Sequence, residues 1–265
     1  MVGPVLIFDS GVGGLSVAGA VRHHSPQAAL CYACDNAMLP YGKREDGWLV
    51  QRIVDVCLAA VEACRPSVLV VACNTASTLA LDSLRERLSI PVVGTVPAIK
   101  PAALHSRSRH IALLATSATV ARPYTQRLID AFAGDCRVTR VAADELVGVA
   151  EGWLRGEPAP VELIDTTLAP LWQATREVPP LDTVVLGCTH FPLLKPWFVS
   201  LAPCPLEWVD SGEAIARRVA QVAPWLEAHP QDGSCFTTAP APELQAGLAA
   251  YGFTEPQPLP VPSAR

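Results

Sequence analysis

The chain is poor in charge and has no long apolar run. Only 17% of its 265 residues are charged, and its formal net charge is -5. No cluster of Lys and Arg indicates a surface for nucleic acid or for an anionic membrane. The longest apolar runs are far too short to span a bilayer, and the opening "MVGPVLIFDSG" lacks the basic segment of a secretory signal. We therefore expect a cytoplasmic protein with neither nucleic acid nor membrane as a partner.

Lysine is rare, and the cysteine pairs that a zinc site needs are incomplete. The only lysines are Lys43, Lys100 and Lys195, and none lies in a recognisable pyridoxal phosphate motif. "CYAC" places Cys31 and Cys34 at CxxC spacing, but no second pair with zinc spacing exists. The sequence thus indicates neither a zinc site nor a pyridoxal phosphate site.

The chain has nine cysteines, an odd number, and is too long to need disulfide bonds for stability. In a reducing cytosol we expect free thiols. Cys31 and Cys34 lie on a predicted strand and should point to opposite faces, so we interpret both as core residues. The same interpretation applies to the cysteines that have no polar neighbours in sequence: Cys57, Cys64, Cys136, Cys204 and Cys235.

Half of the chain is apolar, which is enough for a sizeable core. Short Val-, Ile- and Leu-rich runs, apolar on both parities as in buried parallel strands, alternate with helical segments. This alternation predicts an α/β fold with mainly parallel sheets flanked by helices. The predicted strands are 4–9, 29–34, 67–73, 91–96, 110–115, 136–142, 182–188, 206–210 and 234–238. The predicted helices are 14–24, 45–64, 76–88, 119–133, 144–154, 161–176, 212–227 and 241–251.

The chain is predicted to form two similar lobes with the active site in the cleft between them. The segment 94–110 reads as a junction, because it carries two prolines and becomes polar before a second series of strands begins. A return to the first lobe is expected near 205–211, where "PLEWVDSG" resembles the opening "LIFDSG". We expect residues 1–97 plus 209–255 in the first lobe and 98–208 in the second. The Pro-rich tail, 256–265, is expected to be disordered.

Two apolar runs end in a cysteine: "VLVVACNTAS" (68–77) at Cys73 and "TVVLGCTHFP" (183–192) at Cys188. Ligands of open α/β sheets bind beyond the carboxyl ends of the strands. A helix N-terminus at that place lowers a thiol's pKa from about 8.5 towards neutrality, which favours a thiolate base or nucleophile. One such cysteine alone is more typically a small buried side chain. Two of them, each followed by threonine and one by His190, favour a functional site.

The first strand ends in Asp9-Ser10-Gly11, and "GVGG" then opens a helix. The glycines permit close backbone approach to a ligand, but their spacing is not that of the dinucleotide fingerprint. Asp9 is either a helix cap or a catalytic group, and Asp210, in the same tripeptide later on, is expected to cap a helix. His190 could exchange a proton with Cys188, although a lone strand-end histidine is more often a hydrogen-bonded surface residue.

Four motifs, in order and spacing, resemble the glutamate racemases of bacterial cell-wall synthesis, within the aspartate/glutamate racemase superfamily: "IFDSGVGGLSV", "PYG", "ACNTAS" and "LGCTHFPLL". The resemblance covers about residues 5 to 225. It implies two α/β lobes and a homodimer. It also implies an isomerase that interconverts L- and D-glutamate for peptidoglycan synthesis, with no cofactor and no metal.

The resemblance also implies roles for individual residues. Cys73 would face D-glutamate and Cys188 would face L-glutamate, with Asp9 assisting the first and His190 the second. The local match around Glu151, "ELVGVAEGW", is loose, and Glu151 is left outside the predicted site. The implied substrate-binding residues are Asp9, Ser10, Tyr41, Gly42, Asn74, Thr75, Thr116, Thr189 and His190.

Three other interpretations stay open. A racemase of aspartate or another small acidic amino acid would use the same chemistry, because one methylene is worth only about 1–3 kcal/mol in discrimination. An amide hydrolase would need only Cys188 and His190, and would leave Cys73 inert. A purely regulatory protein, for example one that contacts gyrase, would need no turnover at all.

Overall fold

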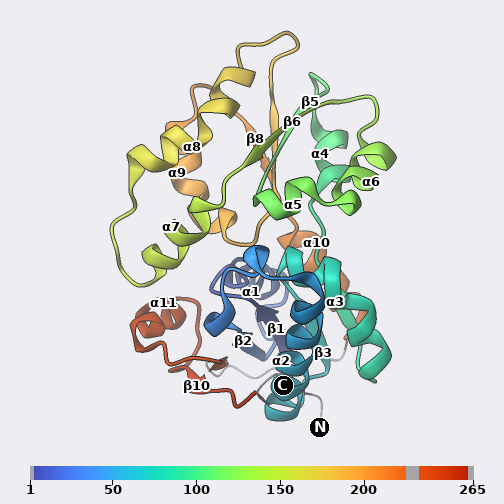
Figure 1. Cartoon of the computed structure of the whole chain (residues 1–265), viewed down its shortest axis with the longest axis vertical. Helices are drawn as coiled ribbons and strands as arrows, with labels where there is room; N and C mark the ends of the chain where they lie inside the picture. Colours follow the sequence, from blue (N-terminus) through green and yellow to red (C-terminus); the bar gives the residue numbers. More distant parts are fainter. Residues whose placement is uncertain (1–2, 225–232, 262–265) are drawn as a thin grey trace.

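The strands of the chain form two separate parallel sheets, one in each half of the molecule (Figure 1). The computed structural model describes residues 3–224 and 233–261. The sheet of the first lobe has the order β10-β9-β2-β1-β3-β4, and that of the second lobe β6-β5-β7-β8. The strands are β1 (Val5–Asp9), β2 (Leu30–Cys34), β3 (Val68–Val71), β4 (Val92–Gly94), β5 (His110–Ala115), β6 (Arg137–Ala142), β7 (Thr183–Leu186), β8 (Glu207–Val209), β9 (Ser234–Thr237) and β10 (Gln257–Pro258).

The strands of the first sheet are buried on both faces, as their sequences predict. Along β1, Val5 and Ile7 pack into one apolar cluster, while Leu6 and Phe8 pack into another. Side chains of α2 (Asp46–Cys64) and α3 (Asn74–Arg87) complete the cluster around Leu6. Side chains of α1 (Leu15–His24) and α10 (Gly212–Val222) belong to the cluster around Val5. Full burial of one such side chain contributes about 1.5–3 kcal/mol to the free energy of unfolding. Apolar side chains on both faces of β1 therefore stabilise the lobe.

The second sheet is also covered on both faces. Ile111 and Leu113 of β5 pack with α4 (Ile99–His105) and α6 (Pro123–Phe132). Ala112 and Leu114 face the other layer, which consists of α7 (Glu145–Leu154), α8 (Val161–Ala174) and α9 (Lys195–Leu201). The chain also has two short helices, α5 (Ser117–Ala121) and α11 (Gln245–Ala250).

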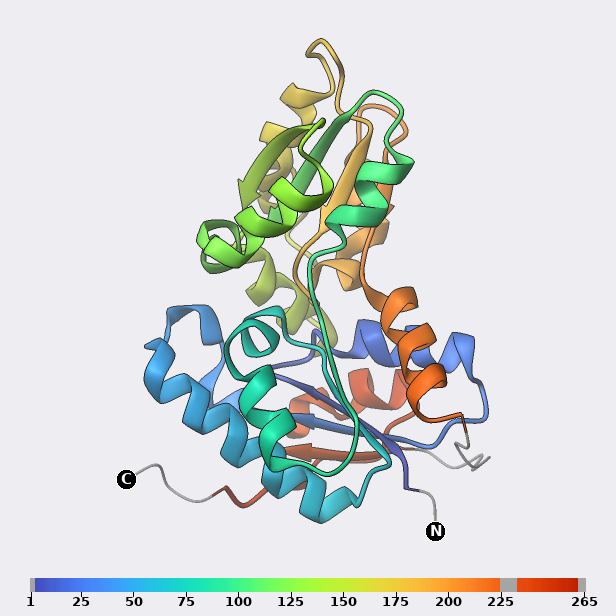
Figure 2. The same ribbon diagram turned by 90° about the vertical axis from the view of Figure 1, so that its right-hand side faces the viewer.

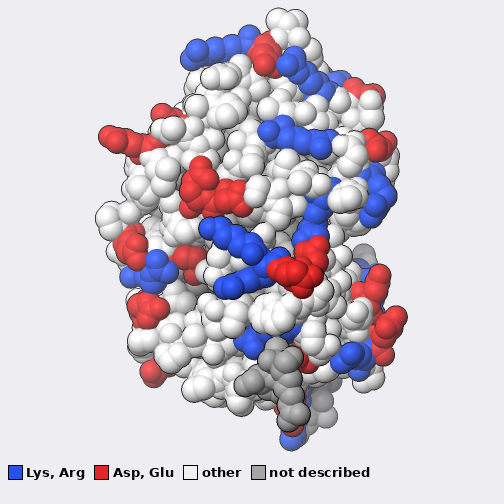
Figure 3. Space-filling view, viewed as in Figure 1, with Lys and Arg blue, Asp and Glu red and all other residues white. Residues whose placement is uncertain are grey.

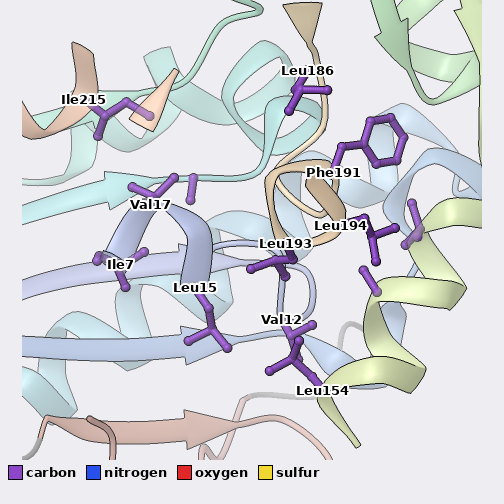
Figure 4. Close-up of a cluster of buried hydrophobic side chains, with 14 of the residues drawn as sticks. Ile7, Val12, Leu15, Val17, Leu154, Leu186, Phe191, Leu193, Leu194 and Ile215 are labelled. Atoms are coloured by element: carbon purple, nitrogen blue, oxygen red, sulfur yellow. The ribbon is translucent and has the colours of Figure 1, made fainter. Parts of the chain in front are cut away.

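The two lobes share one apolar core. Figure 4 shows Val12, Leu15 and Val17 of the first lobe beside Leu193 and other side chains of the second. Two linkers connect the sheets, one from β4 to α4 and one from β8 to α10 (Figure 2), and the Ser211 hydroxyl of the second donates to the Val96 carbonyl of the first. Because this core is continuous between the lobes, close packing fixes the distance and orientation between the strand ends of one lobe and those of the other.

The predicted α/β class is confirmed, and the nine predicted strands all occur. Two helices were missed. Ile99–His105 forms α4 in the predicted junction, and Lys195–Leu201 forms α9, because proline is accepted in a helix's first turn. Asp210 was expected to cap α10; its carboxylate accepts from the N–H of the first residue, Gly212, at 2.7 Å, but the N-cap position belongs to Ser211. The second sheet includes Val209 of β8 and the first includes Gln257–Pro258 of β10, while the lobe boundaries stay a prediction.

The end of the chain differs from the expected disorder. Gln257–Pro258 pair with β9 as strand β10, and Leu259 is only 4% exposed. Burial of Leu259 against the first lobe, together with a bond from its N–H to the Thr237 carbonyl at 2.8 Å, holds this segment in place. Residues 262–265 lie outside the described residues, as does the end of the helix predicted over 212–227.

The expectation of free thiols throughout is wrong for one pair. Cys31 of β2 and Cys64 at the end of α2 form a disulfide, with Cα atoms 6.7 Å apart. Residues 33 positions apart come together because α2 packs across the face of the sheet to which Cys31 points. Cys34 points to the opposite face, as predicted.

Charges of both signs are interspersed over the face shown in Figure 3. No helix within residues 3–224 and 233–261 has the length and apolar character needed to cross a membrane.

Candidate active site

A cavity of about 540 Å³ lies between the lobes at the carboxyl ends of their strands. Ser10 follows β1, Cys73 follows β3, Thr116 follows β5 and Cys188 follows β7, and all four line this cavity. The carboxyl ends of the strands of both parallel sheets thus face the same cavity. Ligands of α/β proteins bind at this end of the sheet. The two cysteines reach the cavity from different lobes.

Cys73 is buried, with 7% of its surface exposed, and it directly precedes α3. Its Sγ lies 3.7 Å from the Ser10 hydroxyl. Burial, followed by the nearby Asp9 carboxylate, raises the pKa of Cys73 to about 12, while the Ala76 N–H and the Ser10 hydroxyl act in the opposite direction. The expected lowering of this pKa is therefore wrong, because loss of hydration outweighs the helix N-terminus. Cys73 is a thiol at neutral pH.

Cys188 lies in a different setting, beside a buried histidine. Its Sγ is 3.7 Å from Nδ1 of His190, and Nε2 of His190 is 2.7 Å from Oε1 of Glu151. Burial alone would lower the pKa of His190, but its hydrogen bonds to Cys188 and to the Glu151 carboxylate raise it well above its usual range. The raised pKa favours the imidazolium form of His190, and a cation of this kind stabilises a neighbouring thiolate.

Asp9 lies behind the lining of the cavity and is fully buried. Its carboxylate accepts a hydrogen bond from the Ser10 N–H at 2.7 Å and one from the Thr189 hydroxyl at 3.0 Å. Burial raises the pKa of Asp9, and the nearby His190 partly offsets that effect. Asp9 thus links a residue of the Cys73 wall to a residue of the Cys188 wall.

The glycines of "GVGG" have a use that the sequence did not indicate. A Cβ on Gly13 would overlap Thr189 and His190, and one on Gly11 would overlap the Glu151 carboxylate. These glycines therefore let the β1–α1 turn approach side chains of the second lobe, rather than only a ligand.

All but one of the predicted substrate-binding residues line the cavity; the exception is Asp9, which lies behind the lining. The lining includes Gly42, Asn74, Thr75, Thr116 and Thr189, together with Ser10, Tyr41 and His190. The Tyr41 hydroxyl, however, donates to Asp35 at 2.9 Å. Of the residues described, none donates a hydrogen bond to the buried Oδ1 of Asn74, so this acceptor is free to receive one from a ligand.

Glu151, which the sequence analysis left outside the predicted site, lines the cavity. It comes from α7 of the second lobe, is 5% exposed, and accepts a bond from the Val12 N–H of the first lobe at 2.8 Å. A carboxylate in the mainly apolar "ELVGVAEGW" was the available signal, because a buried charge needs partners. Its partners lie 39 and 139 positions away, and a single sequence does not display such pairs.

An ion pair between Arg122 and Asp46 joins the lobes outside the described lining of the cavity. The Arg122 guanidinium donates two hydrogen bonds to Asp46 at the start of α2, at 3.0 and 3.1 Å. Across residues 3–224 and 233–261, no group of three or more His, Cys, Asp or Glu side chains is arranged to hold a metal ion.

The fold and the site define a class of protein: a two-lobed α/β enzyme with a cysteine from each lobe in a shared cavity. Residues 16–219 match the Asp/Glu/Hydantoin racemase family, and the chain belongs to that family. Glutamate racemase of Shewanella piezotolerans is 50% identical over 219 residues, which cover 83% of this chain and 80% of that protein. Glutamate racemase of Klebsiella pneumoniae is 44% identical, covering 97% of this chain and 92% of that one.

A solved structure extends the comparison to the whole fold. Escherichia coli glutamate racemase, in complex with L-glutamate and the activator UDP-MurNAc-Ala, is similar with a TM-score of 0.91. The two chains are 42% identical, and the match covers 97% of this chain and 98% of the other. The predicted two-lobe racemase fold is confirmed.

Proposed function

We propose that this protein interconverts L- and D-glutamate without a cofactor, with Cys73 and Cys188 as the two proton-transferring groups. The observation that carries the proposal is the cavity that both thiols line, one from each lobe. Inverting a stereocentre requires a base on one side of Cα and an acid on the other. Two groups of the same kind suit this task because each must take either role.

Starting from L-glutamate, the Cys188 thiolate removes the Cα proton and becomes a thiol. The electron pair of the broken C–H bond stays on the substrate, and the Cys73 thiol donates its own proton to the opposite side of Cα. The raised pKa of Cys73 and the raised pKa of His190 fit these starting states. Proton transfer by a positioned group is typically worth about 10²–10⁴-fold, so stabilisation of the carbanion by N–H and O–H donors must supply more.

The other site residues serve binding and orientation. The Asn74 acceptor suits the substrate's ammonium group, while Ser10, Thr75 and Thr116 offer hydroxyl groups for its carboxylates. The Thr189 hydroxyl donates its proton to Asp9, so its oxygen can accept from the ammonium group. Asp9 and His190 assist Cys73 and Cys188, in that order. The D-glutamate would serve peptidoglycan synthesis, and we place the enzyme in the cytoplasm. We also expect a homodimer, and light scattering of the purified protein tests that oligomeric state.

The test follows optical rotation and solvent exchange together. Purified protein with L-glutamate and no added cofactor, in D₂O, should lose circular dichroism while deuterium appears at Cα, as seen by proton NMR. Inversion without deuterium uptake would overturn the two-base mechanism. Measured against L-aspartate, kcat/KM should favour glutamate by about tenfold or more; a preference for aspartate would favour that alternative.

A hydrolase that uses Cys188 and His190 is less well supported. It leaves Cys73 without a role, whereas Cys73 lines the same cavity.

A further inference from the structure

Beneath one wall of the site lies a fully buried carboxylate, that of Asp35, directly after β2. It accepts two hydrogen bonds from Arg52 of α2, at 2.9 and 2.7 Å. It accepts another from the Thr238 hydroxyl at 2.6 Å and one from the Tyr41 hydroxyl at 2.9 Å. A buried charge with this many donors is strongly held, because every lone pair finds a partner.

The loop that follows Asp35, residues 36–43, forms part of the cavity wall. Tyr41 and Gly42 both line the cavity, and Gly42 approaches Ala118 of the second lobe. With its hydroxyl bonded to Asp35, Tyr41 anchors this loop from below. Burial, followed by the Asp35 carboxylate, raises the pKa of Tyr41 well above its usual range, so the hydroxyl stays a donor.

A second contact holds the same loop from the C-terminal segment. Thr238 follows β9, and its hydroxyl also accepts from the Ala37 N–H at 3.2 Å. Asn36 exchanges two hydrogen bonds with Ala239, at 3.0 and 2.9 Å. Neither Thr238 nor Asp35 belongs to the described lining of the cavity, so both act at a distance from any ligand.

We propose that Asp35 is a positioning residue: held by Arg52 and Thr238, it fixes the 36–43 loop through Tyr41 and so sets the substrate-binding wall. This inference rests on the proposed function, because it assigns loop 36–43 a part in binding glutamate. Fixing the loop before the substrate arrives lowers the ordering cost of binding. The C-terminal segment thereby acquires a role in activity, although it contributes no residue to the cavity lining that the structure describes.

Thr238→Val is the sharpest test, because it removes one donor to Asp35 without touching the lining. We expect KM for L-glutamate to rise about three- to tenfold, with a smaller change in kcat. Thr238→Ser keeps the hydroxyl and should restore KM. In a Tyr41→Phe background, Thr238→Val should add little, because both changes act on one chain of bonds. Asp35→Asn should raise KM further.

Asp182→Asn is the matched control. Asp182 also accepts several hydrogen bonds, from Ser106, Ser108 and Thr183, but it precedes β7, at the sheet edge away from the cavity. It should lower the melting temperature and leave KM unchanged. If Asp35→Asn does not fold, Thr238→Val decides. Folded Thr238→Val with wild-type KM overturns the inference alone, whereas wild-type protein without glutamate racemisation overturns the proposed function and this inference with it.

Discussion

The two cysteine walls of the cavity look alike in sequence and differ in chemistry. Each is an apolar strand that ends in cysteine and a threonine-containing turn. Around Cys73 the structure places a hydroxyl and a buried carboxyl group, those of Ser10 and Asp9. Around Cys188 it places an imidazole bonded to a carboxylate, those of His190 and Glu151. One wall thus favours a thiol, and the other provides a cation for a thiolate.

This difference teaches that a repeated motif need not give a repeated environment. Both thiols stand at strand ends, yet burial dominates the pKa of Cys73. On the other wall, His190 is positioned by α7, a helix from outside the motif. In the proposed reaction the asymmetry sets a starting state, with Cys188 ready to take a proton from L-glutamate and Cys73 ready to give one.

The largest effects should come from removing either sulfur. Cys73→Ala and Cys188→Ala should each lower racemisation by about 10³-fold or more. The two variants should differ in which enantiomer exchanges its Cα proton with solvent. Cys73→Ala keeps Cys188, the base that faces L-glutamate. It should therefore still wash deuterium into L-glutamate without inverting it, and Cys188→Ala should do so with D-glutamate. Proton NMR in D₂O measures both.

Cys57→Ala provides the control for these variants, because Cys57 is buried in α2 within the core of the first lobe. It should keep racemisation per folded molecule. Full racemisation by Cys73→Ala would contradict the two-base assignment.

A smaller effect is expected on the Cys188 wall alone, from Glu151→Gln. The neutral amide removes a carboxylate that raises the pKa of His190. The imidazolium should then lose its proton at lower pH, so the alkaline limb of kcat/KM should move down by about one unit or more. The stabilisation from protonated His190 is complete below the unfolded pKa near 6.5 and is lost as pH rises through the raised folded value.

Glu145→Gln is the matched control, since Glu145 lies on the same helix and lines the same cavity but accepts its hydrogen bond from Thr167 rather than from His190. Its alkaline limb should stay in place. An unshifted limb in Glu151→Gln would remove His190 as the cation beside Cys188.

The smallest effect concerns Asp9, on the Cys73 wall. Burial raises the pKa of Asp9, so the charged form costs free energy at neutral pH. Asp9→Asn should lower kcat about tenfold while leaving the free energy of unfolding unchanged or higher at pH 7. Any gain should shrink as pH falls and vanish below the unfolded pKa near 3.8, where the wild-type carboxyl is protonated in both states. Thermal melts at pH 4 and 7 measure this; a large loss at pH 7 would show that the charge stabilises the fold.

Much of the site could be predicted because it lies at strand ends, where chain-local signals are strong. Cys73 and Cys188 each end an apolar run, Ser10 follows the strand that ends in Asp9, and a strand–turn–helix pattern is visible in one sequence. Glu151 could not be assigned in this way, since its partners come from distant elements. The same holds for the contact of Asp35 with Thr238, which lies 203 positions away. The disulfide between Cys31 and Cys64 was missed for the same reason.

Alternation of buried strands and helices determined the α/β class, because apolar residues on both parities require cover on both faces of a sheet. The sequence by itself also placed a thiol at the carboxyl end of one strand in each lobe. Only the tertiary structure decided what surrounds each thiol. Electrostatics in a buried site depends on distances between groups far apart in the chain, and packing of the two lobes on one shared core sets those distances.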